Sequence, residues 1–123
     1  MHPVGKFAET YTARYLRRQG YRILERNFRT NYGEIDIIAC NRQYIVFIEV
    51  KARTSFAHGT ALEAISHGKR HRISNTAMLY LQRHPTELQV RFDAAGLLVQ
   101  QGRFRMKVLE FQYVENADLG EGR

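Results

Sequence analysis

The sequence lacks the features that mark secreted and membrane-spanning proteins. Its 123 residues include one cysteine, Cys40, so no disulfide can form within the chain and nothing requires an oxidising compartment. No apolar run approaches the roughly 18 residues of a membrane-spanning helix. The first residues also lack the apolar segment of a signal peptide. We therefore expect a cytoplasmic protein without a membrane partner.

Common metal-binding and nucleotide-binding patterns are missing as well. There is no cysteine pair, and the five histidines show no recognised ligand spacing, although His67 and His71 are four residues apart. A phosphate loop of the Gly-Lys-Ser/Thr type is absent. Repeats, low-complexity segments and interdomain linkers are also absent. We expect one domain over residues 1–112 and a flexible, polar tail over 113–123.

Positive charge is the feature in excess. The chain has 19 Lys+Arg against 12 Asp+Glu, a formal net charge of +7, which favours an anionic partner such as nucleic acid or a membrane surface. Only four of these cations are lysines, so arginine, whose planar fork suits phosphate, predominates. The alternative is a solvated basic surface with no specific partner.

Two segments concentrate the basic residues. Six arginines within sixteen positions form the densest candidate for phosphate contacts, namely Arg14, Arg17, Arg18, Arg22, Arg26 and Arg29. The second segment, 67–72, is also explained by a solvated helix face. Our candidate nucleic-acid-binding residues are Arg17, Arg18, Arg29, Arg53, Lys69 and Arg72.

Hydrophobic periodicity predicts two helices and five strands. A helical pattern covers 4–19 and ends at Gly20, and a capping box at Thr60–Glu63 begins a second helix that Pro85 ends. Segments rich in β-branched and aromatic residues predict strands at 21–28, 33–40, 44–51, 88–99 and 103–111.

Charged residues interrupt the two adjacent apolar strands at 33–40 and 44–51. Because side chains alternate along a strand, Glu49 and Lys51 share one face, opposite the apolar side chains. Asp36 on the neighbouring strand supplies a second carboxylate, and Glu9 lies on the inward stripe of the first helix. Asp93 is a further carboxylate in an apolar run, without an assigned role.

These oxygen ligands suit Mg²⁺ or Mn²⁺, held by Glu9, Asp36 and Glu49. Such a metal would polarise a phosphodiester, and Lys51 would orient the attacking water. The same spacing is equally consistent with a salt bridge between strands, so the pattern alone leaves both interpretations open.

Several motifs, taken together, resemble the YraN-like bacterial proteins. They include Gly5-x-x-x-Glu9, Asn27-x-Arg29, Gly33-Glu34-Ile35-Asp36, Val46-Phe47-Ile48-Glu49-Val50-Lys51-x-Arg53, Lys69 and Arg91-Phe92-Asp93. The resemblance covers roughly residues 5 to 111. This family is grouped with the PD-(D/E)XK nucleases and is similar to Holliday-junction resolvases and restriction endonucleases. It implies an α/β fold of three α/β/α layers, with a central mixed sheet and a restriction-endonuclease-like αβββαβ core.

The resemblance also implies roles for the candidate catalytic residues. Asp36 matches the first acid of the motif, Glu49 the second and Lys51 the lysine, while Glu9 matches the helical acid of the resolvase-like branch. Ile35 replaces the proline of the motif, a variable position. Glu34, which we expect to point away from Asp36, is treated as an accessory residue.

The resemblance implies a Mg²⁺-dependent or Mn²⁺-dependent endonuclease that hydrolyses phosphodiester bonds, in DNA rather than RNA, with branched or repair intermediates as substrates. One alternative is an inactive protein that binds nucleic acid through a nuclease-like fold. A second is an interaction protein whose charged strand residues form a buried ion network. A resolvase-like role would require a two-fold homodimer.

Overall fold

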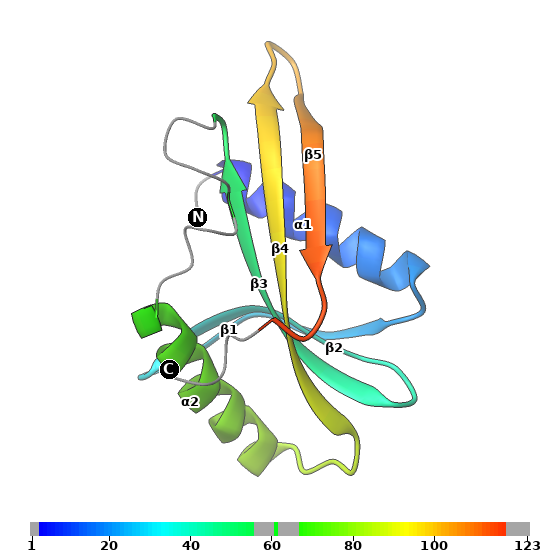
Figure 1. Cartoon of the computed structure of the whole chain (residues 1–123), viewed down its shortest axis with the longest axis vertical. Coiled ribbons are helices and arrows are strands. Elements are labelled where there is room, and N and C mark those ends of the chain that lie inside the picture. Colours follow the sequence, from blue (N-terminus) through cyan, green and yellow to red (C-terminus); the bar gives the residue numbers. More distant parts are fainter. Residues whose placement is uncertain (1–2, 56–60, 62–66, 118–123) are drawn as a thin grey trace.

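The computed structural model describes residues 3–55, 61 and 67–117, without the side chains of 67–72. Two helices and five strands are described (Figure 1): α1 Pro3–Arg18, β1 Arg22–Thr30, β2 Gly33–Cys40, β3 Tyr44–Arg53, α2 His67–Arg83, β4 Gln89–Gln101 and β5 Met106–Val114. This order confirms the predicted αβββαβ core, followed by the fifth predicted strand. The predicted start of the second helix, at Thr60, lies outside the described residues.

The five strands form one mixed sheet in the order β1-β2-β3-β4-β5. Strands β3 and β4 are parallel, whereas the other neighbouring pairs are antiparallel. A parallel pair needs a long crossover connection, and α2 lies in the segment between β3 and β4. The carboxyl ends of β3 and β4 therefore meet at the same end of the sheet, where Lys51 pairs with Gly96.

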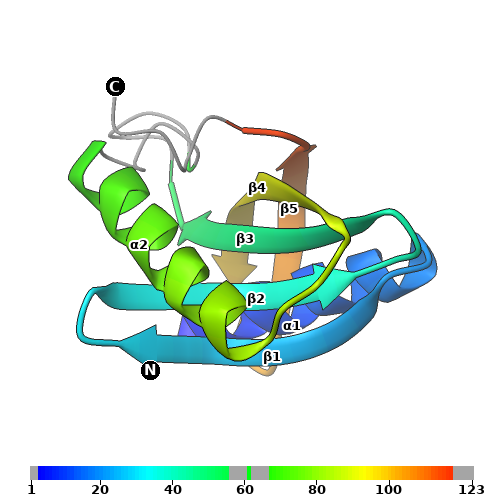
Figure 2. The ribbon, with the colours of Figure 1, turned by 90° about the horizontal axis from the view of Figure 1, so that it is seen from below.

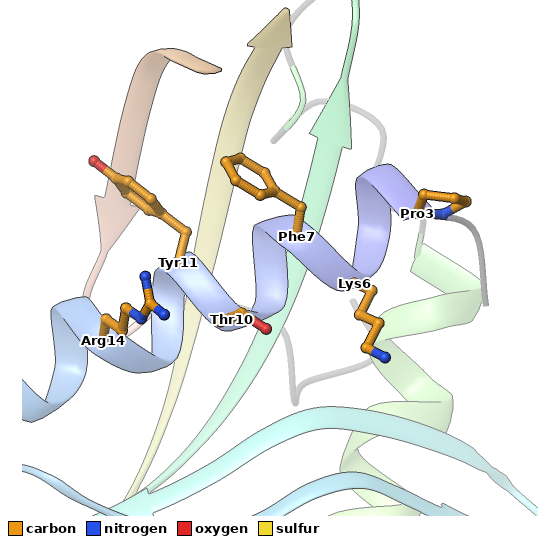
Figure 3. Close-up of a pocket in the computed structure, with 6 residues that line it drawn as sticks. All are labelled: Pro3, Lys6, Phe7, Thr10, Tyr11 and Arg14. Atoms are coloured by element: carbon orange, nitrogen blue, oxygen red, sulfur yellow. The ribbon is translucent and has the colours of Figure 1, made fainter. Parts of the chain in front are cut away.

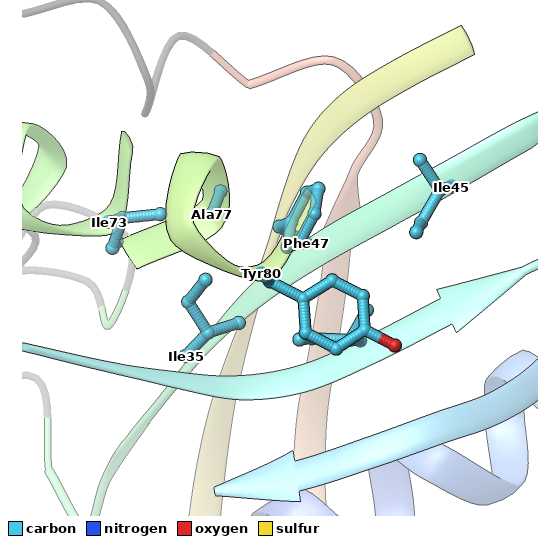
Figure 4. Packing of buried hydrophobic residues seen from close by; sticks show 7 residues of the cluster. Ile35, Ile45, Phe47, Ile73, Ala77 and Tyr80 are labelled. Carbon is cyan, nitrogen blue, oxygen red and sulfur yellow. The ribbon is translucent and has the colours of Figure 1, made fainter. Parts of the chain in front are cut away.

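The helices cover opposite faces of the sheet, as Figure 2 shows, which confirms the predicted three layers. On one face, Leu16 of α1 is buried with Ile37 and Ile48. On the other face, Tyr80 of α2 packs with Ile35 and Phe47 in the cluster drawn in Figure 4. Within the described part of the chain, no helix is both long and apolar enough to cross a membrane.

Small residues allow α1 to lie close to the sheet. The stripe of α1 that faces it is mostly small, with Ala8 and Ala13 fully buried, so the helix lies close to the strands. Phe47 is fully buried on the opposite face of the sheet. The centre of its ring lies 6.0 Å from the ring centre of Tyr80 and 5.6 Å from that of Phe92. Burial of such a side chain contributes about 1.5 to 3 kcal/mol.

The carboxyl-terminal strand differs from its predicted limits. It begins at Met106 rather than 103, because residues 102–105 form the turn of the β4–β5 hairpin. It continues to Val114, and the backbone N–H of Asn116 donates to Asp93 Oδ1 at 2.8 Å. Ordered contacts thus extend beyond the predicted boundary at residue 112.

Candidate functional site

A pocket of about 380 Å³ lies where the end of β3 meets the first turn of α1. Three of the four predicted catalytic residues, Asp36, Glu49 and Lys51, line it. Arg53, predicted to bind nucleic acid, also lines it. The remaining lining residues are Val4, Gly5, Val50, Ala52 and Thr54. The structure therefore gathers two carboxylates and two cations around one opening.

The pocket forms where β2 and β3 diverge. Their paired residues run from Cys40↔Ile45 to Ile37↔Ile48. Beyond that point, the backbone N–H of Val50 donates to Asp36 Oδ2 at 2.7 Å. The carboxylate of Asp36 thus takes the place of a backbone acceptor, which fixes its position.

The alternation of β2 breaks at the same place. In a regular strand Ile35 and Ile37 would share a face, but Ile35 packs with α2 and Ile37 with α1. Asp36, between them, is 8% exposed. This local irregularity places the carboxylate at the opening between the strands rather than in either apolar layer.

Strand β3 supplies the other side of the pocket. Val46, Ile48 and Val50 pack on the α1 side, which confirms that these apolar residues share one face. Glu49 is 2% exposed, and Lys51 is partly buried. Their partners on β4 are Ala94, with only a methyl group, and Gly96, with no side chain, and both leave space beside a charged residue.

Glu9 is not among the residues that line the pocket. Its Oε1 accepts a hydrogen bond from Asn27 Nδ2 at 3.1 Å and forms a 3.5 Å ion pair with Arg26. Asn27 adopts a left-handed backbone conformation, with φ at 55°, which asparagine tolerates better than most residues. Burial first, and then the negative charge of Asp36, raise the pKa of Glu9, against the opposing effect of Arg26.

Two of the three predicted metal ligands, Asp36 and Glu49, line the pocket. Among the described residues, no three His, Cys, Asp or Glu side chains form a group that could hold a metal ion. The role of Glu9 as a third ligand stays a prediction. The two carboxylates that share the pocket still suit Mg²⁺, because this ion binds proteins through one or two carboxylates and keeps several waters.

The orientation of Glu34 relative to Asp36 stays a prediction. Its negative charge is the last of the effects that raise the pKa of Glu9. Glu34 also pairs with Arg29, a predicted nucleic-acid-binding residue that remains largely exposed.

The other predicted nucleic-acid-binding residues lie on the exposed side of α1, outside the description, or in the pocket. Arg17 and Arg18 are exposed in the last turn of α1. The side chains of Lys69 and Arg72 are not among those described. Arg53 lines the pocket, and its Nε is buried without a hydrogen-bond partner among the described atoms.

Asp93 belongs to a separate buried network. It is fully buried and accepts hydrogen bonds from Arg91, from the Tyr113 hydroxyl at 2.6 Å and from the backbone of Asn116. Arg91 also donates to the hydroxyl of Tyr21 at 2.6 Å. None of these residues lines the pocket. The geometry gives Asp93 a structural role.

Comparisons with known proteins agree with the predicted resemblance. Residues 8–97 match the model of the family described as Uncharacterised protein family UPF0102, the YraN family. A UPF0102 protein of Trichlorobacter lovleyi is 46% identical over 101 residues, which are 80% of each chain. One of Clostridium botulinum (strain Loch Maree) is 44% identical over 98 residues, 78% of this chain and 80% of its own. One of Syntrophomonas wolfei is 39% identical over 104 residues, 84% of this chain and 90% of its own.

Proposed function

The chain belongs to the UPF0102 family, and from this membership together with its pocket we propose that it is a Mg²⁺-dependent endonuclease acting on DNA. The observation that carries the proposal is the meeting of Asp36, Glu49 and Lys51 in one open pocket where two strands diverge. Carboxylates at such a position are paired or bind a cation, because burial of an uncompensated charge is costly. Mn²⁺ would serve in place of Mg²⁺.

In this proposal, the residues of the pocket have distinct roles. Asp36, fixed by the Val50 N–H, and Glu49 would hold the metal. When bound, the ion would polarise the phosphodiester and make a water more acidic. The ammonium group of Lys51 would orient that water and offset the charge that develops on the phosphate. Glu9, bonded to Asn27 and Arg26, would hold α1 against β1 beside Asp36.

A second surface, on the outer side of α1, supports a nucleic-acid substrate. A hollow of about 460 Å³ is lined by Lys6, Arg14, Phe7, Tyr11, Thr10 and Pro3, shown in Figure 3. It begins next to Val4 and Gly5, which line the catalytic pocket. Cations bind phosphates, whereas Phe7 packs on the core and Tyr11 packs on the ring of Phe111. The surface would therefore accept a strand that leaves the pocket.

The charges of α1 are not explained by the stability of the helix. Its single acidic residue, Glu9, is buried, and its first turn contains no acid. Lys6 lies near the amino-terminal end, where the helix dipole disfavours positive charge. Arg17 and Arg18, at the other end, suit both the dipole and phosphates. The helix presents a cationic outer face along its length.

The same surface also favours a second candidate function, a protein that binds nucleic acid without cutting it. The two functions make different demands on Asp36, which catalysis requires and backbone-phosphate binding does not. A resolvase-like action on two strands would additionally require a two-fold dimer.

The test is cleavage of a labelled panel of single-stranded, duplex, flap and four-way-junction DNA and of RNA, with Mg²⁺ or Mn²⁺. Asp36→Asn keeps an oxygen that accepts from Val50 but removes the charge, and it should abolish cutting. The matched control is Glu87→Gln, an exposed acid outside the pocket, which should cut like the unaltered protein. Salt-sensitive binding without cutting would support the second candidate. Neither binding nor cutting would overturn both.

A further inference from the structure

The turn between β4 and β5 presents an aromatic ring to solvent. Phe104 is 90% exposed, the highest value among the large apolar residues described. The turn that carries it is closed by a hydrogen bond from the Gly102 N–H to the Arg105 carbonyl at 2.8 Å. A Cβ at position 102 would lie 2.7 Å from that carbonyl oxygen, so the tight turn requires glycine. The exposure of Phe104 is thus part of a defined turn.

Positive charges surround this ring. Arg103 and Arg105 flank it, Lys107 follows, and no acidic residue occurs from Val99 to Leu109. The guanidinium carbon of Arg103 lies 5.4 Å from the centre of the Phe104 ring. Exposed apolar residues are ordinary on protein surfaces, but an exposed ring among cations matches a partner that offers both bases and phosphates.

The hairpin reaches beyond the catalytic pocket at the same end of the sheet. Lys51 pairs with Gly96, and β4 continues from there to Gln101 (Figure 1). Five strand residues at about 3.3 Å each span roughly 17 Å. That length equals about five base-pair steps of duplex DNA. The tip is therefore placed to contact the same DNA molecule as the pocket.

We propose that Phe104 is a wedge that stacks on the exposed base pair at the branch point of a branched DNA, with Arg103 and Arg105 on the adjacent phosphates. A branch point already exposes a base-pair face, so the wedge needs little unstacking there, whereas in continuous duplex it must separate stacked pairs. The wedge rests on the proposed nuclease function and deepens it. It specifies a substrate whose branch lies about five base pairs from the cleaved bond.

The test compares binding of labelled forked DNA and linear duplex of the same sequence, by fluorescence anisotropy with Mg²⁺ in an Asp36→Asn background that leaves the DNA intact. Phe104→Ala should lower affinity for the fork roughly 5- to 150-fold, the effect of losing one stacked base, and change linear duplex little. Phe104→Tyr keeps the ring and should keep the preference. Leu109→Ala, at an apolar residue of β5 that is 48% exposed, is the matched control and should bind like the background protein.

Arg105→Ala provides an independent readout. It should weaken binding to both DNA forms. The fall of log affinity with log salt should become shallower by about 1 in slope. Phe104 and Arg105 are both exposed, so neither Phe104→Ala nor Arg105→Ala should disturb the fold. Equal melting temperatures of the variants and the background protein would verify this.

Each outcome of this test has a distinct meaning. A fork preference that survives in Phe104→Ala overturns the wedge, and so does the absence of any preference in the background protein. If the background protein binds anionic phosphatidylglycerol vesicles, its Phe104→Ala variant does not, and neither prefers the fork, a membrane surface would replace DNA as the partner. Mg²⁺-dependent cutting by the unaltered protein, scored separately, shows whether the nuclease proposal survives the loss of the wedge.

Discussion

Replacement of Arg91 by alanine should destabilise the fold more than any loss of an exposed arginine. The Arg91 side chain is 9% exposed, and that of Asp93 is fully buried. Two hydrogen bonds of 2.9 and 2.8 Å join them. The guanidinium carbon also lies 4.6 Å from the ring centre of Tyr44. Burial alone would lower the pKa of Arg91, but its hydrogen bonds to Asp93 and Tyr21 raise it above the ordinary value.

The magnitude follows from what the substitution leaves behind. Asp93 would remain buried with the Tyr113 hydroxyl and the Asn116 N–H, but without a cation at hydrogen-bonding distance. Removing one partner of a buried ion pair costs about 3 to 5 kcal/mol. For a chain of this size, the melting temperature should fall on the order of 10 °C or more.

The assay is urea unfolding, followed by circular dichroism, of the unaltered protein, Arg91→Ala and Arg42→Ala. Arg42 is exposed in the β2–β3 turn, so its loss should change the unfolding free energy by less than about 0.5 kcal/mol. The double variant Arg91→Met/Asp93→Leu removes both charges and should recover much of the loss. A cost of less than about 1 kcal/mol for Arg91→Ala would refute the argument that the network supports the fold.

Three further predictions concern the core, a titrating residue and the metal. Phe47→Ala should cost about 3 to 5 kcal/mol in urea unfolding, because it opens a cavity beside Tyr80, and a loss under about 1 kcal/mol would contradict the packing. Burial and Asp36 raise the pKa of Glu9 above 4.5, so its contribution to stability is complete below pH 4.5 and is lost as pH rises through the raised value. Glu9→Gln should therefore flatten this part of the stability–pH curve, and an unchanged curve would assign the effect elsewhere. Mg²⁺ should raise the melting temperature of the unaltered protein but not of Asp36→Asn, and an equal rise in both would place the ion away from Asp36.

The order of elements was predictable because local sequence determines it strongly. The β-branched runs at 33–40 and 44–51 form β2 and β3, and the small stripe of residues 4–16 packs on the sheet. The crossover that makes β3 and β4 parallel followed only from the resemblance. Periodicity indicates which segments are strands, but not how they pair.

The divergence of β2 and β3 at Asp36 was beyond prediction from pattern. It depends on a side chain that replaces a backbone acceptor for Val50, and regular alternation gives no sign of this. The expectation that Glu34 points away from Asp36 does not follow from regular alternation, because side chains two apart on a strand share a face. Glu9, which is predicted to hold metal, accepts a hydrogen bond from Asn27, a contact that no spacing in the sequence indicates.

The hairpin tip was missed because its sequence, Arg103-Phe104-Arg105, alternates like a strand. The close approach of Gly102 to Arg105 turns it into an exposed loop instead. The available signal was the absence of acids around a lone phenylalanine.

The proposed function requires that the pocket of Asp36, Glu49 and Lys51 cuts phosphodiester bonds with a divalent cation. We would compare the rates at which the purified protein and Glu49→Gln, which preserves shape and removes the charge, cut a labelled forked DNA in Mg²⁺. Metal-dependent cutting should fall by at least roughly 10- to 100-fold in the variant, the effect expected when a metal site is weakened. Equal rates in the two proteins would refute the proposed site.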